Sequence, residues 1–225
     1  MPRQPAPRGR TGRPPRTSRA RILAAARELI DRDGWEALTV RRLAAELGVG
    51  ATTLYHHVRN REELLVLLLS EHLGRMERPA LPDDPRDRIV AGAVAMRDAA
   101  AAWPFVAEVV TTDGFVGLID EDALWMVEAI VAGAEDCGCT PAQAVYLFRS
   151  VYYYTVGEVL VRANTASRRA GDLPPARLGD LDAAKVPRLA AIGDVWPETA
   201  ARDTYARGLA AFVDGLLAQI TSTGL

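Results

Sequence analysis

The segment from Thr39 to Asn60, TVRRLAAELGVGATTLYHHVRN, constrains the fold of this chain more than any other part of its sequence. Thr39 is a natural N-cap, because its hydroxyl oxygen can accept from the free N–H groups of a first helical turn. Apolar residues then recur at i, i+3, i+4 and i+7, which predicts one buried helix face: Val40, Leu43, Ala44 and Leu47. Gly48 follows where a helix ends, since glycine adopts the left-handed conformation without steric cost.

A second short helix is predicted over residues 51–58. Val49 fills the corner between the two helices, and Leu54 and Val58, at i and i+4, point inward. Two short helices joined by a glycine-containing turn are typical of a helix-turn-helix. In that motif the first helix braces the DNA backbone and the second enters the major groove.

Helices are also predicted on both sides of this motif. One covers about residues 18–33 and ends at Gly34, with an apolar stripe formed by Ile22, Ala25, Ala26, Leu29 and Ile30. The other begins at Asn60, with Glu63 three residues later in a capping-box arrangement, and runs to about Met76. It is apolar on more than one side, so we expect two different partners to bury it.

From Ala20 through Met76 the sequence resembles the DNA-binding domain of the TetR (tetracycline-repressor) family, most specifically in LYHHVRNREELL. The resemblance is looser afterwards, in helix order, total length and an apolar last helix. It implies an all-α fold with an N-terminal three-helix helix-turn-helix domain and a C-terminal helical domain for ligand binding and dimerisation. It also implies a sequence-specific repressor of a palindromic operator, in which a small-molecule effector moves the fourth helix.

The same resemblance assigns residues to DNA. Arg41 would make a bidentate hydrogen-bonded contact with a guanine, which is the commonest specific contact. The phosphate contacts would come from Thr39, Thr53, Tyr55 and Arg61, and the bases or sugars would be lined by Ala51, Thr52, His56 and His57. The family often has Ser, Asn or Glu where this chain has Gly50, so a phosphate contact from that position is not expected. Tyr55 also fits a packing role with a solvated hydroxyl.

No metal site or cofactor is expected. His56 and His57 are adjacent on a helix and therefore point about 100° apart, which does not favour joint chelation. The third histidine of the chain is His72. Cys137 and Cys139 are too close for an easy disulfide and too few for structural zinc, so we predict free thiols, with redox sensing as the alternative.

The charge is unevenly distributed. Residues 1–78 hold 15 Arg against 9 Asp and Glu, whereas residues 79–225 hold 12 Lys and Arg against 20 Asp and Glu. A basic first third is expected where a chain meets phosphate. Residues 1–17, rich in Pro, Gly and Arg, are predicted to be a disordered basic arm. This arm either contacts DNA or is a solvated tail that raises non-specific affinity.

The proline-rich segment 79–85 predicts a hinge between a DNA-binding domain, 18–78, and an effector-binding and dimerisation domain, 79–225. No part of the second domain alternates with the period of a strand. Helices are predicted at about 86–102, 104–112, 120–136, 140–166, 185–193 and 200–221, with a long loop over 167–182.

The last helix carries an apolar stripe that predicts a two-fold dimer, built together with the 140–166 helix as a four-helix bundle. The stripe consists of Leu209, Phe212, Val213, Leu216, Leu217 and Ile220. Packing only on its own core is the alternative. One recognition helix reads few base pairs, so useful specificity favours two half-sites and a homodimer.

Aromatic residues between hinge and dimer helices suggest a pocket for a largely apolar or aromatic effector. The candidates are Trp103, Phe105, Glu108, Trp125, Phe148, Arg149, Tyr152 and Glu158, with Arg97 and Asp113 as further polar groups. Three consecutive tyrosines, residues 152–154, cannot all face one core. Tetracycline is not expected, because its family receptor uses histidine in the body and this chain has none after His72.

Other classes of function fit less well. The sequence has no nucleophile elbow, phosphate-binding glycine loop or HExxH motif, so an enzyme is not expected. A regulator or DNA-organising protein that responds to a protein partner, without a small-molecule effector, remains as the alternative. No apolar run is long enough to span a membrane, and no secretion signal is evident, so a cytoplasmic location is expected.

Overall fold

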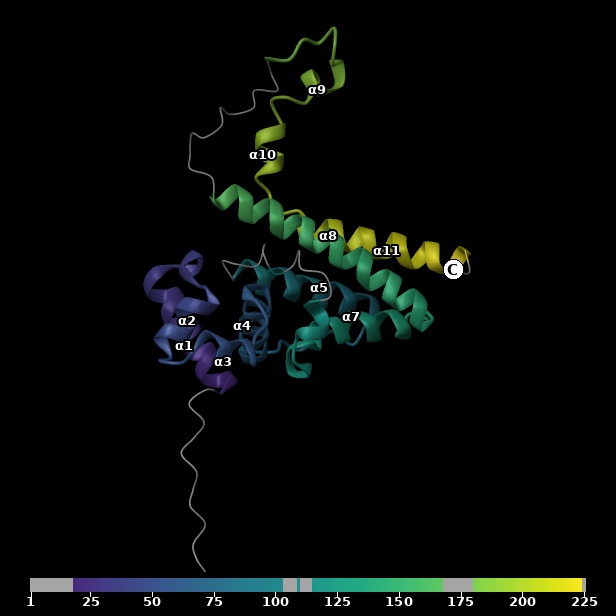
Figure 1. Ribbon diagram of the computed structural model, residues 1–225. Coiled ribbons are helices and arrows are strands. Elements are labelled where there is room, and N and C mark those ends of the chain that lie inside the picture. Colours follow the sequence, from purple (N-terminus) through teal and green to yellow (C-terminus); the bar gives the residue numbers. More distant parts are fainter. Residues whose placement is uncertain (1–17, 103–108, 110–114, 168–179, 224–225) are drawn as a thin grey trace, which may run out of the picture. The chain divides into compact units, whose positions relative to one another are not determined.

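The computed structural model describes residues 18–102, 109, 115–167 and 180–223 of the 225-residue chain. Throughout these residues the regular structure is helical and no strand occurs (Figure 1). The predicted all-α fold is therefore confirmed. The chain divides into two compact units, residues 1–68 and residues 69–225. Their boundary lies inside a helix, ten residues before the predicted hinge.

Unit 1 contains the first three helices that the sequence predicts and the first half of the fourth. Helix α1 spans Arg19–Asp33, the 3₁₀ helix η1 spans Trp35–Ala37, α2 spans Val40–Glu46 and α3 spans Ala51–Tyr55. The side chains of Ile22, Leu29, Leu38, Leu43 and Leu54 are fully buried. Gly34 and Gly48 both have positive φ, at 82° and 65°, and the chain turns at these glycines after it leaves α1 and α2.

Helix α4 spans Arg61–Arg75 and belongs to both units. Its start is capped as predicted: the N–H of Glu63 donates to the Asn60 side chain at 2.8 Å, and the Glu63 carboxylate accepts from the N–H of Arg59 at 2.6 Å. Leu64, Leu65, Val66, Leu68, Leu69 and Leu73 are all buried. Apolar residues on more than one side of this helix are therefore buried, and the expectation that two partners cover it stays a prediction.

Unit 2 is built on helices α5 (Pro85–Ala101), α7 (Trp125–Asp136), α8 (Pro141–Ser167) and α11 (Tyr205–Thr223). One core cluster joins all four through Ile89, Ile130, Leu147, Val151, Leu209 and Val213. Helices α8 and α11 run side by side (Figure 1). Asp84 caps α5 by accepting from the N–H of Asp87 at 2.9 Å, which places the helix start at the last residue of the predicted hinge.

Several helix boundaries in unit 2 differ from prediction. Helix α7 begins at Trp125 because the 3₁₀ helices η2, Phe115–Leu118, and η3, Glu121–Ala123, precede it. The prediction missed α10, Trp196–Ala200, which follows the short α9, Pro187–Ala191. Helix α11 begins at Tyr205, whose N–H donates to the Asp203 side chain at 3.1 Å. The helix predicted at 104–112, most of the 167–182 loop and the 1–17 arm lie outside the described residues.

Candidate functional site

The outward side of α3 and the two residues that follow it carry polar side chains that have no partner in the described part of the chain. Leu54 and Val58, 0% and 1% exposed, anchor the helix, as predicted from their spacing. Thr52, Thr53, Tyr55, His56 and His57 are exposed, and Ala51 is half-buried. Among the described residues, none of these five polar side chains hydrogen-bonds or pairs with another group. They are therefore free to bind an external partner.

Helix α2 carries one further side chain without a partner among the described residues, Arg41, whereas the nearby Arg32 and Arg42 are paired. The Arg42 guanidinium donates to Asp33 at 2.6 Å, and Arg32 donates to Glu46 at 2.5 Å, which ties α1 to α2. Arg41 is exposed and has no acidic partner in the described part of the chain. Thr39 caps α2 by accepting from the N–H of Arg42 at 3.2 Å. An exposed cation without an acidic partner, on the helix next to α3, suits contact with a base or a phosphate.

The structure places Arg61 differently from the other predicted DNA contacts. Its Nε–H donates to the carbonyl of Leu38 at 3.0 Å, and a terminal N–H donates to the carbonyl of Trp35 at 3.3 Å. The guanidinium also lies 4.9 Å from the centre of the Trp35 ring. Arg61 thus ties the start of α4 to η1 from within unit 1. This role is structural, and the predicted phosphate contact would have to share the same guanidinium.

Replacement of Arg61 by alanine distinguishes these two roles. We expect the free energy of unfolding of unit 1 to fall by about 1–3 kcal/mol, because charge-assisted hydrogen bonds and a cation–π contact are lost. Urea denaturation measures this. Arg59→Ala is the control, since Arg59 is 87% exposed and lies 3.9 Å from Glu63. Unchanged stability, together with a salt slope of DNA binding reduced by about one unit, would contradict the structural role.

The start of α3 has no side-chain cap. Gly50 occupies the N-cap position with φ −69° and ψ 143°, and no side chain accepts from the first turn. Glycine has no side chain that could cap the first turn, and the N–H of Thr53 donates to the Gly50 carbonyl at 2.9 Å.

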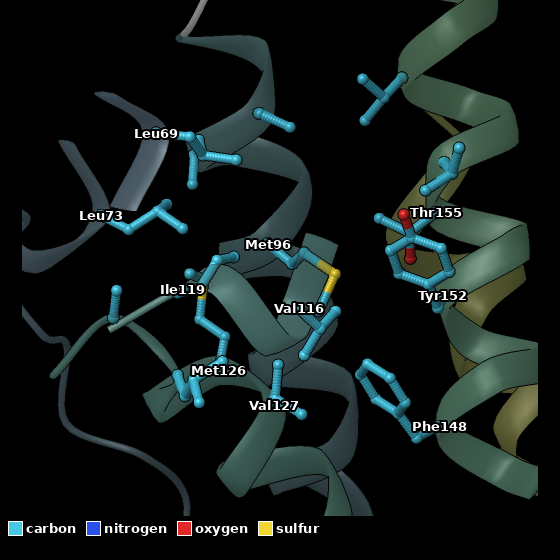
Figure 2. A pocket seen from close by; sticks show the side chains of 16 residues that line it. Leu69, Leu73, Met96, Val116, Ile119, Met126, Val127, Phe148, Tyr152 and Thr155 are labelled. Atoms are coloured by element: carbon cyan, nitrogen blue, oxygen red, sulfur yellow. The ribbon is translucent and has the colours of Figure 1, made fainter. Parts of the chain in front are cut away.

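A cavity of about 60 Å³ lies inside unit 2 (Figure 2). Helices α5, α7 and α8, the second half of α4, and the η2–η3 segment all contribute to it. Its lining is Leu69, Leu73, Met96, Ala99, Ala100, Val116, Ile119, Ala123, Leu124, Met126, Val127, Phe148, Tyr152, Thr155, Val156 and Val159. Two of these residues carry a polar side-chain atom, Tyr152 and Thr155.

Two of the predicted pocket residues, Phe148 and Tyr152, do line this cavity. Arg149 does not, because it turns outward to donate to the Tyr153 hydroxyl at 2.5 Å, and Glu158 does not, because it pairs with Arg162 on the helix surface. Trp125 is buried beside a separate surface groove, and its indole N–H has no partner among the described residues. Trp103, Phe105, Glu108 and Asp113 lie outside the described residues.

Sequence reasoning missed Thr155, which is 1% exposed and lines the cavity. Its hydroxyl lies 2.8 Å from the carbonyl of Val151 and 2.7 Å from the Tyr205 hydroxyl, which in turn lies 3.2 Å from the carbonyl of Ala93. Burial raises the pKa of Tyr205 to about 12, so the phenol stays neutral. The spacing of residues 148, 152, 155 and 159 on one helix face is the signal that could have found it.

The three consecutive tyrosines point in three directions, which agrees with the expectation that they cannot all face one core. Tyr152 lines the cavity, and burial raises its pKa to about 12. Tyr153 is exposed beside Arg149. Tyr154 stacks on Phe212 of α11, with ring centres 5.3 Å apart. One turn of α8 therefore contributes to the cavity, the outer surface and the α8–α11 contact.

The structure corrects the set of residues predicted to form a dimer contact. Leu209, Val213, Leu216 and Ile220 are buried in the core of their own chain, at 6% exposure or less, so they cannot contact a partner directly. Phe212 and Leu217 are partly buried and pack at the edge of that core. The apolar stripe of α11 thus serves mainly its own core, which is the alternative that the sequence left open.

Helix α8 instead presents apolar side chains to solvent. Val145, Tyr146, Tyr153 and Val161 are 46–65% exposed and lie along one side of the helix. An exposed apolar patch of this kind on a regular helix is typical of an interaction surface.

The remaining chemistry of the described residues is simple. No group of three or more metal-binding side chains occurs among them. None of the helices in the described part of the chain is long and apolar enough to cross a membrane. Cys137 and Cys139 are free thiols whose pKa values are raised by burial, which lowers the fraction of reactive thiolate at neutral pH.

Comparisons with known proteins agree with this arrangement. Residues 22–68 match the model for bacterial regulatory proteins of the tetR family. The chain is 30% identical over 205 residues, 87% of its own length and 88% of the relative's, to the Escherichia coli tetracycline repressor protein class A from transposon 1721.

Two solved structures share the fold over most of the chain. The Streptomyces coelicolor protein ActR, solved in complex with (S)-DNPA, superimposes with a TM-score of 0.70 at 24% identity, covering 90% of this chain and 98% of that one. BioQ, solved with its double-stranded DNA operator, gives a TM-score of 0.58 at 26% identity, covering 90% and 99%.

Proposed function

This chain belongs to the TetR family of bacterial regulatory proteins, and on that premise we propose that it is a homodimeric repressor whose operator binding is modulated by a small-molecule effector. It is a DNA-binding transcriptional regulator and not an enzyme. The dimer, the effector and the residue roles below are our proposals, as is a location in the cytoplasm, where the DNA of a bacterium lies.

The observation that carries the proposal is the set of unpaired polar groups on α2 and α3. We assign base reading to Arg41, because it is exposed and lacks an acidic partner among the described residues. The phosphate contacts come from Thr39, Thr53 and Tyr55, with Arg61 as a weaker candidate. Ala51, Thr52, His56 and His57 line bases or sugars. In other helix-turn-helix proteins too, phosphate contacts position the protein on DNA and base contacts read the sequence.

The dimer is proposed to form through the exposed side of α8 and the edge of α11. Exposed Val145, Tyr146, Tyr153 and Val161 supply the apolar surface on α8, and partly buried Phe212 and Leu217 supply it on α11. Two-fold pairing would give two copies of α3, as an inverted repeat requires.

The effector site is proposed to be the cavity of unit 2, with Phe148 and Tyr152 retained from the sequence prediction and Thr155 added. Helix α4 supports a link to DNA binding, because its first half lies in unit 1 while Leu69 and Leu73 line the cavity. A ligand that repositions these two leucines would move the helix that continues into unit 1. Effector binding and operator binding would then be coupled.

Selection of bound sites from a genomic DNA library tests DNA reading and dimerisation together. We expect the native protein to recover one inverted repeat and to sediment as a dimer. Val161→Asp, at a 65% exposed position, should sediment as a monomer and recover no repeat, because it places a charge in the proposed apolar contact. Leu81→Asp, at an exposed apolar position outside α8 and α11, is the control and should behave as native.

The outcomes separate the proposals. A dimer of Val161→Asp would contradict the α8 interface. Failure of the native protein to recover any motif would contradict sequence-specific repression and favour a regulator or DNA-organising protein that works without an effector.

A further inference from the structure

Among the residues that the structure describes, the lining of the cavity in unit 2 carries no charged side chain. Its sixteen residues are apolar apart from Tyr152 and Thr155, and these two lie one turn apart on α8 (Figure 2). Three charged groups on the surrounding helices α5 and α8 are engaged elsewhere. Arg97 of α5 binds Asp98 and Asp203, Arg149 of α8 binds the Tyr153 hydroxyl, and Glu158 pairs with Arg162. A charged ligand would therefore lose its hydration without gaining a counter-charge.

The Thr155 hydroxyl limits which polar group a ligand can offer. Its oxygen has two neighbours within the protein, the Val151 carbonyl at 2.8 Å and the Tyr205 hydroxyl at 2.7 Å. The hydroxyl hydrogen is directed either to Val151 or to Tyr205, and it is committed inside the protein in both cases. What remains for a ligand is a lone pair on Thr155 Oγ1. A ligand O–H group, as a donor, matches that lone pair.

The size of the cavity adds a condition on how a ligand enters. At about 60 Å³ it is well below the roughly 300–1,000 Å³ of sites for drug-sized ligands. Met96 and Met126 form part of the wall, and unbranched thioether side chains repack easily around irregular shapes. Leu69 and Leu73 of α4 form another part. Binding must therefore displace lining side chains, including those of α4, because the open space is too small for such a ligand.

We propose that this cavity selects an uncharged, largely apolar ring compound bearing one hydroxyl group that donates to Thr155 Oγ1. The inference deepens the proposed function, on which it rests for the regulatory meaning of binding. It excludes carboxylate ligands and metal-chelated ligands as the preferred class for this chain. Since Thr155 also bonds Tyr205 at the start of α11, the same hydroxyl touches both the ligand and the α8–α11 contact.

Three ring compounds of matched shape test the selectivity: 1-naphthol, naphthalene and 1-naphthoate, titrated into the full chain by calorimetry at neutral pH. We expect 1-naphthol to bind roughly fivefold more tightly than naphthalene, the effect of one net hydrogen bond. The anion 1-naphthoate should bind at least about a hundredfold more weakly than 1-naphthol.

Two variants test the residue. Thr155→Val keeps the shape and should abolish the preference for 1-naphthol over naphthalene, whereas Thr155→Ser keeps the hydroxyl and should retain it. Thermal unfolding by circular dichroism verifies that both variants are folded. A preference that survives in Thr155→Val overturns the role of Thr155, and equal or tighter binding of 1-naphthoate overturns the charge selectivity. Absence of saturable binding by both neutral compounds overturns the inference as a whole.

Fluorescence anisotropy of a labelled operator, measured with the same compounds, separates this inference from the proposed function. Selective binding of 1-naphthol that leaves operator affinity unchanged supports the ligand class but contradicts effector control. Release of the operator by 1-naphthoate in preference to 1-naphthol supports effector control and contradicts the ligand class.

Discussion

Alanine in place of Arg41 is expected to weaken binding to the specific operator by about ten- to a hundredfold and to affect unrelated DNA much less. The reason is that a bidentate contact from arginine to guanine contributes about 1–3 kcal/mol of discrimination. Arg41 is exposed on α2 and has no acidic partner in the described part of the chain, so its loss costs the fold little. Fluorescence anisotropy with the operator and a scrambled duplex at fixed salt measures both affinities.

Arg42→Ala is the matched control, since it removes the same charge from the next position of the same helix. Its guanidinium is held by Asp33 at 2.6 Å. We therefore expect Arg42→Ala to weaken both duplexes alike, through lost charge and a looser α1–α2 contact. If Arg41→Ala also weakened both duplexes to the same extent, Arg41 would be a phosphate contact and not a base-reading group.

Alanine in place of Gly133 is expected to destabilise unit 2 by about 1–3 kcal/mol, towards the upper end of the usual cost of overpacking. Gly133 lies on α7 where this helix crosses the start of α5. An added Cβ would lie 2.7 Å from the carbonyl oxygen of Pro85 and 2.8 Å from Cγ1 of Ile89. The oxygen belongs to the backbone, so a side-chain rotation cannot relieve the clash, and the two helices must separate.

Urea denaturation of the purified protein measures this loss as a lower midpoint. Gly74→Ala is the control, because a Cβ added at Gly74 of α4 meets no atom within 4 Å. Alanine there should leave stability unchanged or raise it by up to about 1 kcal/mol, through better helix propensity. A native midpoint for Gly133→Ala would mean that α5 and α7 do not approach as closely as the structure places them.

Local signals explain why unit 1 could be predicted so closely. The hydroxyl of Thr39, the positive φ of Gly48 and the Asn60–Glu63 cap each act within four residues of where they stand in the sequence. The inward side of α3 follows from the i, i+4 spacing of Leu54 and Val58. Arg61 is the exception, because its partners Trp35 and Leu38 are more than twenty residues away along the chain.

Prediction was less complete in unit 2, because an apolar stripe on a helix fits two different kinds of packing. Leu209, Val213, Leu216 and Ile220 form a stripe that suits either a partner helix or the chain's own core, and the contact with α5 and α8 decides for the core. Arg149 and Glu158 were expected to orient a ligand, but acceptors and donors on the outer surface of α8 hold them away from the cavity.

The sequence by itself therefore determined the all-helical fold, the helix-turn-helix and the outward residues of α3, since caps, glycine turns and apolar periodicity depend on neighbours in the chain. Only the tertiary structure decided that Arg41 is unpaired beside a paired Arg42 among the described residues, that α8 carries an exposed apolar surface, and that Thr155 is a polar group of the cavity. These properties depend on which helices pack together, and residues far apart in sequence, such as Thr155 and Tyr205, acquire their chemistry only through that packing.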